Sequence, residues 1–121
     1  MTYFKTNNTE HLASIAGKMT DRDWDNRESK AITLEMTYAE AAQLFVDGLS
    51  WSIVQRDTVP VYDESGNPTS KTTEQVQEWD NSDFCVAGSI TDNRNGTCTC
   101  KMGKKTASDI LAELEATYDG N

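Results

Sequence analysis

The chain has 121 residues, of which 36% are hydrophobic and 26% are charged, and its formal net charge is -9. A chain of this length can bury one hydrophobic core, so we expect a single domain over residues 1–121. Binding to a nucleic-acid backbone or to anionic lipid requires clustered Lys and Arg, so the acidic excess argues against direct contact with either partner.

Residues 1–19 contain no apolar segment of signal-peptide length, and no window of the sequence approaches the ~20 apolar residues of a membrane-spanning helix. We therefore expect a cytoplasmic protein in a reducing compartment. Structural disulfides are not expected there, although the chain has three cysteines.

Residues 8–19 are predicted to form a short amphipathic helix, because Leu12, Ile15 and Met19 recur at helical spacing. The next segment, DRDWDNRESK at 21–30, is too polar to be buried and is expected to form a loop. Acidic residues occupy every second position of DRDWD at 21–25, as ligands do in a calcium-binding loop. The sixth and twelfth positions lack the Gly and Glu of a calcium loop, so no metal site is assigned.

Residues 31–36 alternate apolar and polar side chains, which is the period-two pattern of a half-buried strand. A helix is predicted to follow, because Thr37 and Glu40 have the spacing of a capping box. Gly48 is expected to end that helix.

A hairpin arm is predicted to project from the domain. Residues 51–61 form its first strand, and Pro60 indicates an edge position because it cannot donate a hydrogen bond to a neighbouring strand. The segment DESGNP at 63–68 concentrates the residues that favour tight turns. Residues 69–79 are almost entirely polar, so the arm has little core of its own.

Residues 84–90 and 97–102 are predicted to form a second hairpin, which contains all the cysteines. A three-residue loop at 94–96, with Gly96 in the left-handed conformation, pairs Asn93 with Thr97 and Ile90 with Cys100. The even-numbered side chains of both strands then point into the core, and these are Val86, Ile90, Cys98, Cys100 and Met102.

In this register Cys98 and Cys100 are buried structural thiols and Cys85 points the other way. A two-residue turn at 95–96 is the alternative, and it would bring Cys85 to the side of the other two cysteines. A tetrahedral metal site still lacks ligands, because the one histidine, His11, lies on a distant predicted element.

Thr106 and Asp109 have the spacing of another capping box, and the last helix is expected to turn Ile110, Leu111 and Leu114 inward. The element order shows no regular alternation of strand and helix after the second helix. The predicted fold class is therefore α+β: an antiparallel sheet with two or three short helices, including a projecting β-hairpin.

Catalytic signatures are absent from the sequence. It has one histidine and no G-x-S-x-G elbow, and GKKT at 103–106 lacks the first glycine of a phosphate-binding loop. No carboxylate pair lies in a context that predicts burial, which would raise one pKa for acid catalysis. We therefore expect no enzyme activity, no cofactor and no metal.

Acidic stretches that contain aromatic residues are the remaining distinctive feature. Trp79 lies in QEWDNSDF, where an aromatic ring surrounded by carboxylates could anchor a protein partner. The alternative is that Trp24 and Trp79 cover the ends of the sheet. The candidate partner-binding residues are Asp21, Asp23, Trp24, Asp25, Asp63, Glu64, Glu74, Glu78, Trp79 and Asp80.

The short length, the acidic balance and the segments YDESGNPTSKT and DNSDFCVAGSITDNRNGTCTCKMGK resemble small accessory proteins of bacteriophages and other mobile elements. This group includes anti-CRISPR proteins and other inhibitors of host defence. The resemblance implies a host protein as partner, such as a nucleic-acid enzyme whose basic groove accepts carboxylates in place of phosphates. We therefore expect a non-catalytic acidic inhibitor of such an enzyme. The alternative is a small virion or tail-assembly component, which would self-associate through the arm or strand edges.

Overall fold

The computed structural model describes the backbone of residues 1–119 and the side chains of residues 1–116. Within this range the strands are β1 (Thr2–Thr6), β2 (Thr9–Asp21), β3 (Arg27–Glu35), β4 (Ser52–Tyr62), β5 (Pro68–Asp80), β6 (Val86–Asp92) and β7 (Thr97–Gly103). The helices are α1 (Tyr38–Leu44) and α2 (Ala107–Asp119).

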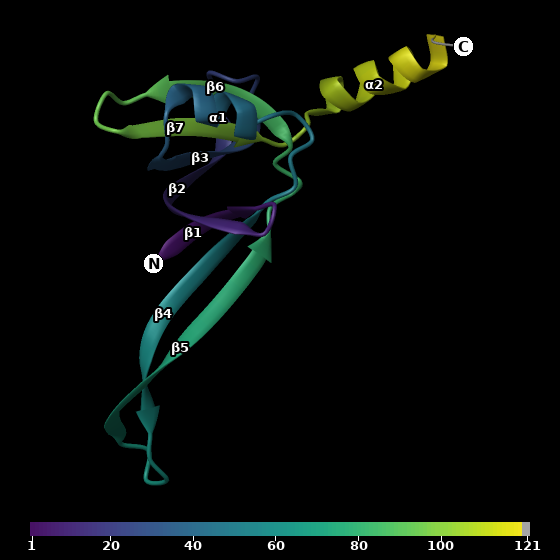
Figure 1. Cartoon of the computed structure of the whole chain (residues 1–121). Coiled ribbons are helices and arrows are strands. Elements are labelled where there is room, and N and C mark those ends of the chain that lie inside the picture. The colour runs from purple at the N-terminus through teal and green to yellow at the C-terminus, as the bar shows by residue number, and fades with distance from the viewer. Residues whose placement is uncertain (120–121) are drawn as a thin grey trace.

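The described strands form one antiparallel sheet in the order β5-β4-β1-β2-β3-β7-β6 (Figure 1). The predicted α+β class is therefore wrong, because the described chain is β-rich and its helices are short. The largest difference is at residues 8–19, where strand β2 replaces the predicted helix.

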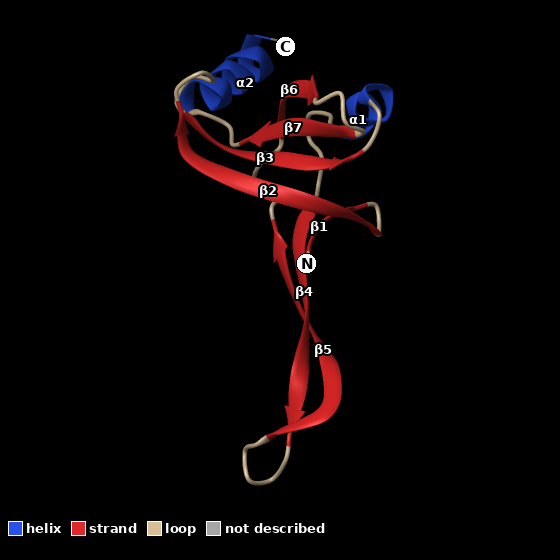
Figure 2. Cartoon of the chain, turned by 90° about the vertical axis from the view of Figure 1, so that its left-hand side faces the viewer, coloured by secondary structure: helices blue, strands red, loops and turns tan. Residues whose placement is uncertain are grey.

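Strand β2 connects two parts of the sheet. Its first residues pair with β1, from Thr6↔Thr9 to Tyr3↔Leu12, and from Ala13 onward it pairs with β3. Figure 2 shows β2, β3 and β7 lying across the direction of β4 and β5. We call β1–β3, β6, β7 and α1 the body, and β4, β5 and their connecting loop (residues 52–80) the arm.

The helix predicted at 8–19 is wrong, because this segment is strand β2. Asn7 and Asn8 have φ values of 52° and 61°, the left-handed pair of a two-residue hairpin turn between β1 and β2. Ile15 packs against the core, whereas Met19 is 80% exposed, so the apolar residues do not share one buried face. Pairing with β1 and β3 overrides the helical spacing.

The segment 21–30 is also not the solvated loop that we predicted. Only its middle forms a turn, and β3 begins at Arg27. Asp21, Arg27 and Ser29 are buried despite their polarity. Each finds a charged or hydrogen-bonding partner in the fold, and burial of polar groups requires such partners.

The capping residues of α1 are as predicted. Thr37 is the N-cap, and its Oγ1 accepts a hydrogen bond of 3.2 Å from the Glu40 backbone N–H. The helix ends at Leu44, earlier than expected, and Gly48 follows with a φ of 84°. Helix α1 lies against β6 and β7, where it covers one face of the sheet (Figure 1).

The core lies between α1 and this face of the sheet. Its aromatic centre is Phe4, whose ring centroid is 4.9 Å from that of Phe45 and 5.2 Å from that of Trp51. The Trp51 indole N–H donates to the Phe84 carbonyl at 2.9 Å, so its polar atom is satisfied inside the core. The other buried apolar residues of the core are Ile32, Leu34, Ala41, Cys98, Cys100 and Met102.

The predicted register of the β6–β7 hairpin is confirmed. The Asn93 N–H donates to the Thr97 carbonyl at 3.0 Å, Ile90 lies opposite Cys100, and Gly96 has a φ of 88°. Cys98 and Cys100 are buried and free, as predicted, and Cys85 is half-buried and also free.

The inward position predicted for Val86 is wrong. A bulge between Ala87 and Ile90 shifts the alternation, so Ala87 lies opposite Met102 and packs against the core, while Val86 lies opposite Gly103.

The predicted capping box of α2 is confirmed. The Asp109 N–H donates to Thr106 Oγ1 at 3.1 Å, and the Thr106 N–H donates to Asp109 Oδ2 at 2.9 Å. The inward orientation predicted for this helix is wrong. Ile110, Leu111 and Leu114 are 48%, 57% and 63% exposed, because α2 extends away from the sheet (Figure 1). Among the described residues, neither helix has the length and apolar content needed to cross a membrane.

Candidate protein-interaction surfaces

The arm is built from a regular two-stranded ladder. β4 and β5 pair without interruption from Ser52↔Asp80 to Pro60↔Thr72, and every residue of β5 is exposed. At the tip, Asp63 Oδ1 accepts hydrogen bonds from the backbone N–H groups of Ser65 at 3.0 Å and Asn67 at 2.9 Å. The Asp63 carboxylate therefore stabilises the turn, and Glu64 beside it is exposed.

Ion pairs join the arm to the body at its base. The Arg56 guanidinium contacts both Glu10 oxygens, at 2.8 and 2.7 Å, and its Nη1 lies 2.6 Å from Glu74 Oε1. Lys5 Nζ lies 2.9 Å from Glu78 Oε1. The hydrogen bonds from Arg56 lower the pKa of the Glu10 carboxyl. The candidate residues Glu74 and Glu78 are thus compensated by cations of the same chain.

Asp21 lies in a different place, at the end of β2, and its side chain has no solvent exposure. Its Oδ2 lies 2.9 Å from Lys101 Nζ and accepts a hydrogen bond of 3.0 Å from the Ser29 hydroxyl. The Lys101 contact is the main cause that lowers the pKa of the Asp21 carboxyl, and the Ser29 and Asp23 hydrogen bonds add to it. Asp21 is positioned to hold strands together and is not presented at the surface.

Trp24 covers the end of the sheet, as the alternative interpretation proposed. A Cβ atom added to Gly88 would lie 2.6 Å from Cη2 of the indole, and one added to Gly103 would lie 2.8 Å from Cζ3. The Arg27 guanidinium stacks on the same ring, 4.7 Å from its centroid. The neighbouring candidates Asp23 and Asp25 are exposed in the turn.

Arg27 also links this turn to the start of α2. Its Nη1 lies 2.7 Å from Asp109 Oδ2 and donates to the Lys104 carbonyl at 3.0 Å. The contact fixes the first turn of α2 to the body, and the helix extends from that point.

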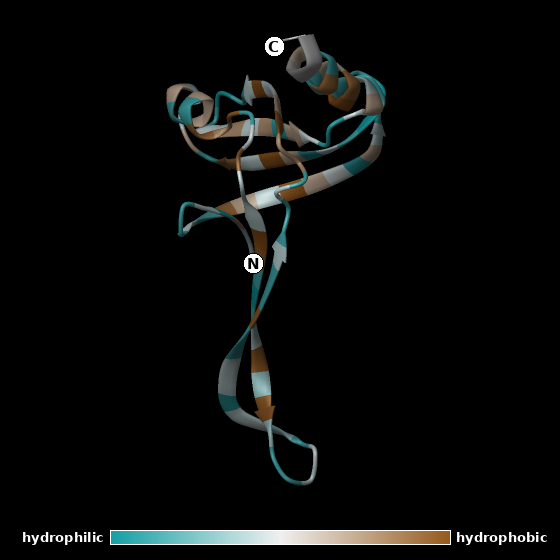
Figure 3. Cartoon of the chain, turned by 90° about the vertical axis from the view of Figure 1, so that its right-hand side faces the viewer, coloured by the Kyte–Doolittle hydropathy of each residue, from teal (hydrophilic) through white to brown (hydrophobic). Residues whose placement is uncertain are grey.

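Trp79 is 49% exposed and lies opposite Ile53, which packs against the core. The adjacent Asp80 accepts hydrogen bonds from Ser82, which lower the pKa of its carboxyl. Farther along the arm, Val76 and Tyr62 are exposed as well. Figure 3 shows apolar bands on the arm and along α2, outside the body.

The structure therefore divides the ten candidate residues among separate places: the β2–β3 turn, the arm tip, and β5. The sequence did not indicate that the apolar residues of α2 lie on the surface. Their spacing predicted an amphipathic helix correctly, but the spacing carries no signal of whether another element covers the apolar face.

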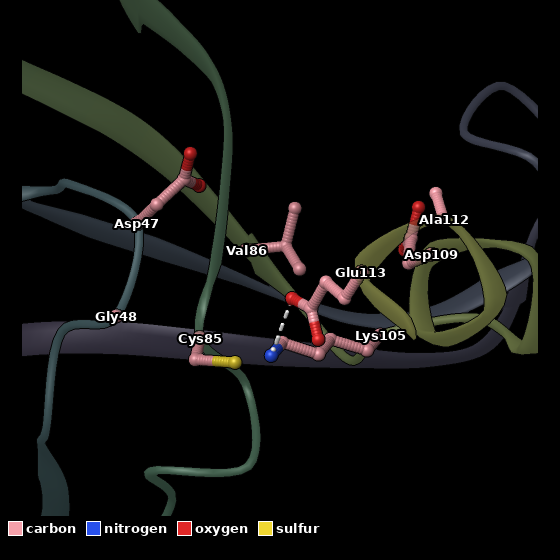
Figure 4. Close-up of a pocket in the computed structure, with 8 residues that line it drawn as sticks. All are labelled: Asp47, Gly48, Cys85, Val86, Lys105, Asp109, Ala112 and Glu113. Carbon is pink, nitrogen blue, oxygen red and sulfur yellow. Dashed lines mark ion pairs between the residues drawn. The ribbon is translucent and has the colours of Figure 1, made fainter. Parts of the chain in front are cut away.

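A pocket of about 510 Å³ lies between α2 and the start of β6 (Figure 4). Lys105 and Glu113 form an ion pair of 2.7 Å across it, and the half-buried Cys85 thiol lies on its wall. The described residues contain no group of three or more His, Cys, Asp or Glu side chains placed to hold a metal ion.

No protein-family model matches this chain, and it has no match among curated proteins or solved structures. The exposed surfaces of the arm and α2 are therefore the features that bear on function.

Proposed function

We propose that the protein is a non-catalytic structural subunit, of the virion or tail-assembly kind, which assembles with copies of itself through the arm and α2 in the cytoplasm of a host cell. The observation that carries this proposal is the exposure of Ile110, Leu111 and Leu114 on a helix that extends from the body. Contiguous apolar surface outside a core is typical of protein contacts. Its burial contributes about 25 cal/mol per Å².

The charges support an apolar contact more than an acidic one. Mimicry of nucleic acid needs carboxylates that are available to a basic groove. Glu74 and Glu78 are paired with Arg56 and Lys5, and Asp21 is buried against Lys101. These three of the eight acidic candidate residues are therefore compensated by cations of the same chain.

An acidic inhibitor of a host nucleic-acid or defence enzyme is the second candidate. The net charge of -9 and the exposed positions of Asp23, Asp25 and Glu64 favour it. Its partner would be a host protein, and its binding would weaken steeply with salt.

Light scattering at low salt and at about 0.5 M salt separates these candidates, since exposed charges are screened at the higher concentration. We expect the wild-type chain to self-associate in both buffers and the variant Ile110→Ser/Leu111→Ser/Leu114→Ser to associate less. Glu115→Ser, an exposed change on the same helix, is the matched control and should associate like the wild type.

A wild-type chain that stays monomeric in both buffers would contradict the assembly role. Self-association that disappears at high salt would contradict the apolar contact.

A further inference from the structure

Strand edges without a neighbour within the described chain include the outer edges of β6 and β5, β4 beyond Arg56, and the β1 side of β2 beyond Leu12. Unpaired edges offer backbone N–H and C=O groups to any extended strand, and proteins commonly protect them. Three of these edges are interrupted. β6 has a bulge between Ala87 and Ile90, β2 has an irregular register between Lys18 and Asp21, and β4 has Pro60.

The backbone hydrogen bonds show why Pro60 protects β4. The Arg56 N–H donates to the Met1 carbonyl at 2.9 Å, on the side of β4 that faces β1. Thr58 and Pro60 follow at intervals of two, so their backbone groups point to that same side, where no strand continues. Proline has no N–H to offer there, which confirms the predicted edge position of Pro60.

Over residues 72–80 the outer edge of β5 has neither a proline nor a bulge. Gln55, Asp57 and Val59 of β4 direct their backbone groups toward β5, where Gln77, Gln75 and Thr73 lie opposite. The intervening residues of β5 therefore point their N–H and C=O groups outward, and these are Thr72, Glu74, Val76 and Glu78. Residues 72–80 keep one continuous register with β4 and contain no proline.

We propose that β5 of a second copy of this chain pairs with this edge, antiparallel, with Gln75 facing Gln75 across a two-fold axis. The pairing deepens the proposed assembly role and rests on it. Addition of a strand to an exposed edge is a common mode of recognition, and an isologous contact is the usual interface of a homodimer.

The charges of β5 select this register. Hydrogen bonds between the two copies form only where residues whose backbone N–H and C=O groups point outward lie opposite residues of the same kind. Centring the pair on Glu74 puts Glu74 against its own copy, and centring it on Val76 puts Glu74 against Glu78, so both registers oppose like charges.

Centring the pair on Gln75 avoids this repulsion. Glu74 then lies opposite Val76, and Glu78 lies opposite Thr72. Lys71, the one cation of β5, lies opposite Trp79 of the other copy, where an ammonium group can stack on the indole. A register centred on Thr73 also avoids the repulsion. In that register the two β5 strands pair over a shorter stretch, and Trp79 lies outside it.

A disulfide tests the register directly. Residues facing each other in a pair without mutual hydrogen bonds have Cβ atoms about 4.5–5.5 Å apart, within reach of a disulfide after small adjustment. In a Cys85→Ser background we expect Gln75→Cys to give, on mild oxidation, a covalent dimer of twice the 13.5 kDa chain mass. Gln77→Cys in the same background is the control, because Gln77 faces Thr73 and not its own copy, and we expect it to remain largely uncrosslinked.

A second pair of variants tests the edge. Val76→Pro removes an outward N–H from β5 and should abolish dimerisation. Thr58→Pro removes an outward N–H from the opposite edge of the same arm and should leave dimerisation as in the wild type.

Failure of this pairing is distinguishable from failure of the assembly role. If the wild-type chain self-associates while Gln75→Cys crosslinks no better than Gln77→Cys and Val76→Pro associates normally, the β5 pairing is overturned and the assembly role stands. If the wild-type chain never associates, both are overturned.

Discussion

Lys101 Nζ lies 2.9 Å from Oδ2 of Asp21, a carboxylate without solvent exposure whose partner is 80 residues away in the sequence. The pair joins the end of β2 to β7 across β3. A buried charge is costly unless it is paired and hydrogen-bonded. The stability of the sheet at the end of β2 therefore depends on this ion pair.

We expect Asp21→Asn to destabilise the fold and to reduce its sensitivity to acid. The Asp21 pKa is lowered in the folded state, so its stabilising contribution is complete above the unfolded pKa of about 3.9 and is lost as the pH falls through the folded pKa. Denaturant unfolding between neutral pH and strong acid measures this slope. Asp23→Asn, at an exposed position, is the control, and an unchanged acid slope in Asp21→Asn would refute the prediction.

Because Trp24 packs closely on Gly103, a single added methyl group at that glycine should change the free energy of unfolding strongly. An added Cβ at Gly103 would lie 2.6 Å from Arg27 Cδ and 2.8 Å from Trp24 Cζ3, so we expect Gly103→Ala to lower the free energy of unfolding by about 1–3 kcal/mol. At Gly17 an added Cβ meets nothing within 4 Å. Gly17→Ala should therefore be neutral or stabilising by about 0.4–1 kcal/mol. Equal effects of the two changes would be inconsistent with this packing.

The cysteines should differ in reactivity. Burial raises the pKa of Cys98, and it raises the pKa of Cys100 to about 12, so both remain protonated thiols at neutral and mildly alkaline pH. We expect a disulfide-exchange reagent at pH 8 to modify Cys85 alone in the native protein and all three cysteines in denaturant. Native Cys85→Ser should then show almost no fast-reacting thiol. Simultaneous reaction of all three thiols in the native wild type would argue against a buried pair.

Removal of the apolar side chains of α2 should affect association without affecting the fold. We expect each of Ile110→Ser, Leu111→Ser and Leu114→Ser to change the free energy of unfolding by less than about 0.5 kcal/mol, because these side chains are exposed. Leu34→Ala, in the core, should cost about 2–5 kcal/mol. Chemical denaturation checks both values, and a cost for the α2 changes as large as that of Leu34→Ala would mean that the helix packs on the body.

Local signals in the sequence predicted local structure well. Thr37 and Thr106 mark the helix starts, the segment 63–68 forms the arm turn, and the loop at 94–96 sets the register that buries Cys98 and Cys100. Each of these features depends on hydrogen bonds between residues that are close in the sequence.

Features that depend on distant residues were not predictable in this way. The turn at Asn7 and Asn8 uses two asparagines and no glycine, so the hairpin signal was weak and the helical spacing of Leu12 and Ile15 dominated. The burial of Asp21 depends on Lys101, and the exposure of α2 depends on the absence of any body element over its apolar residues within the described chain.

Sedimentation equilibrium of the wild-type chain over a wide concentration range, at high salt, tests the proposed assembly role most directly. The role predicts an apparent mass that rises with concentration above the 13.5 kDa of one chain. A mass that stays at the monomer value across the whole range would contradict it.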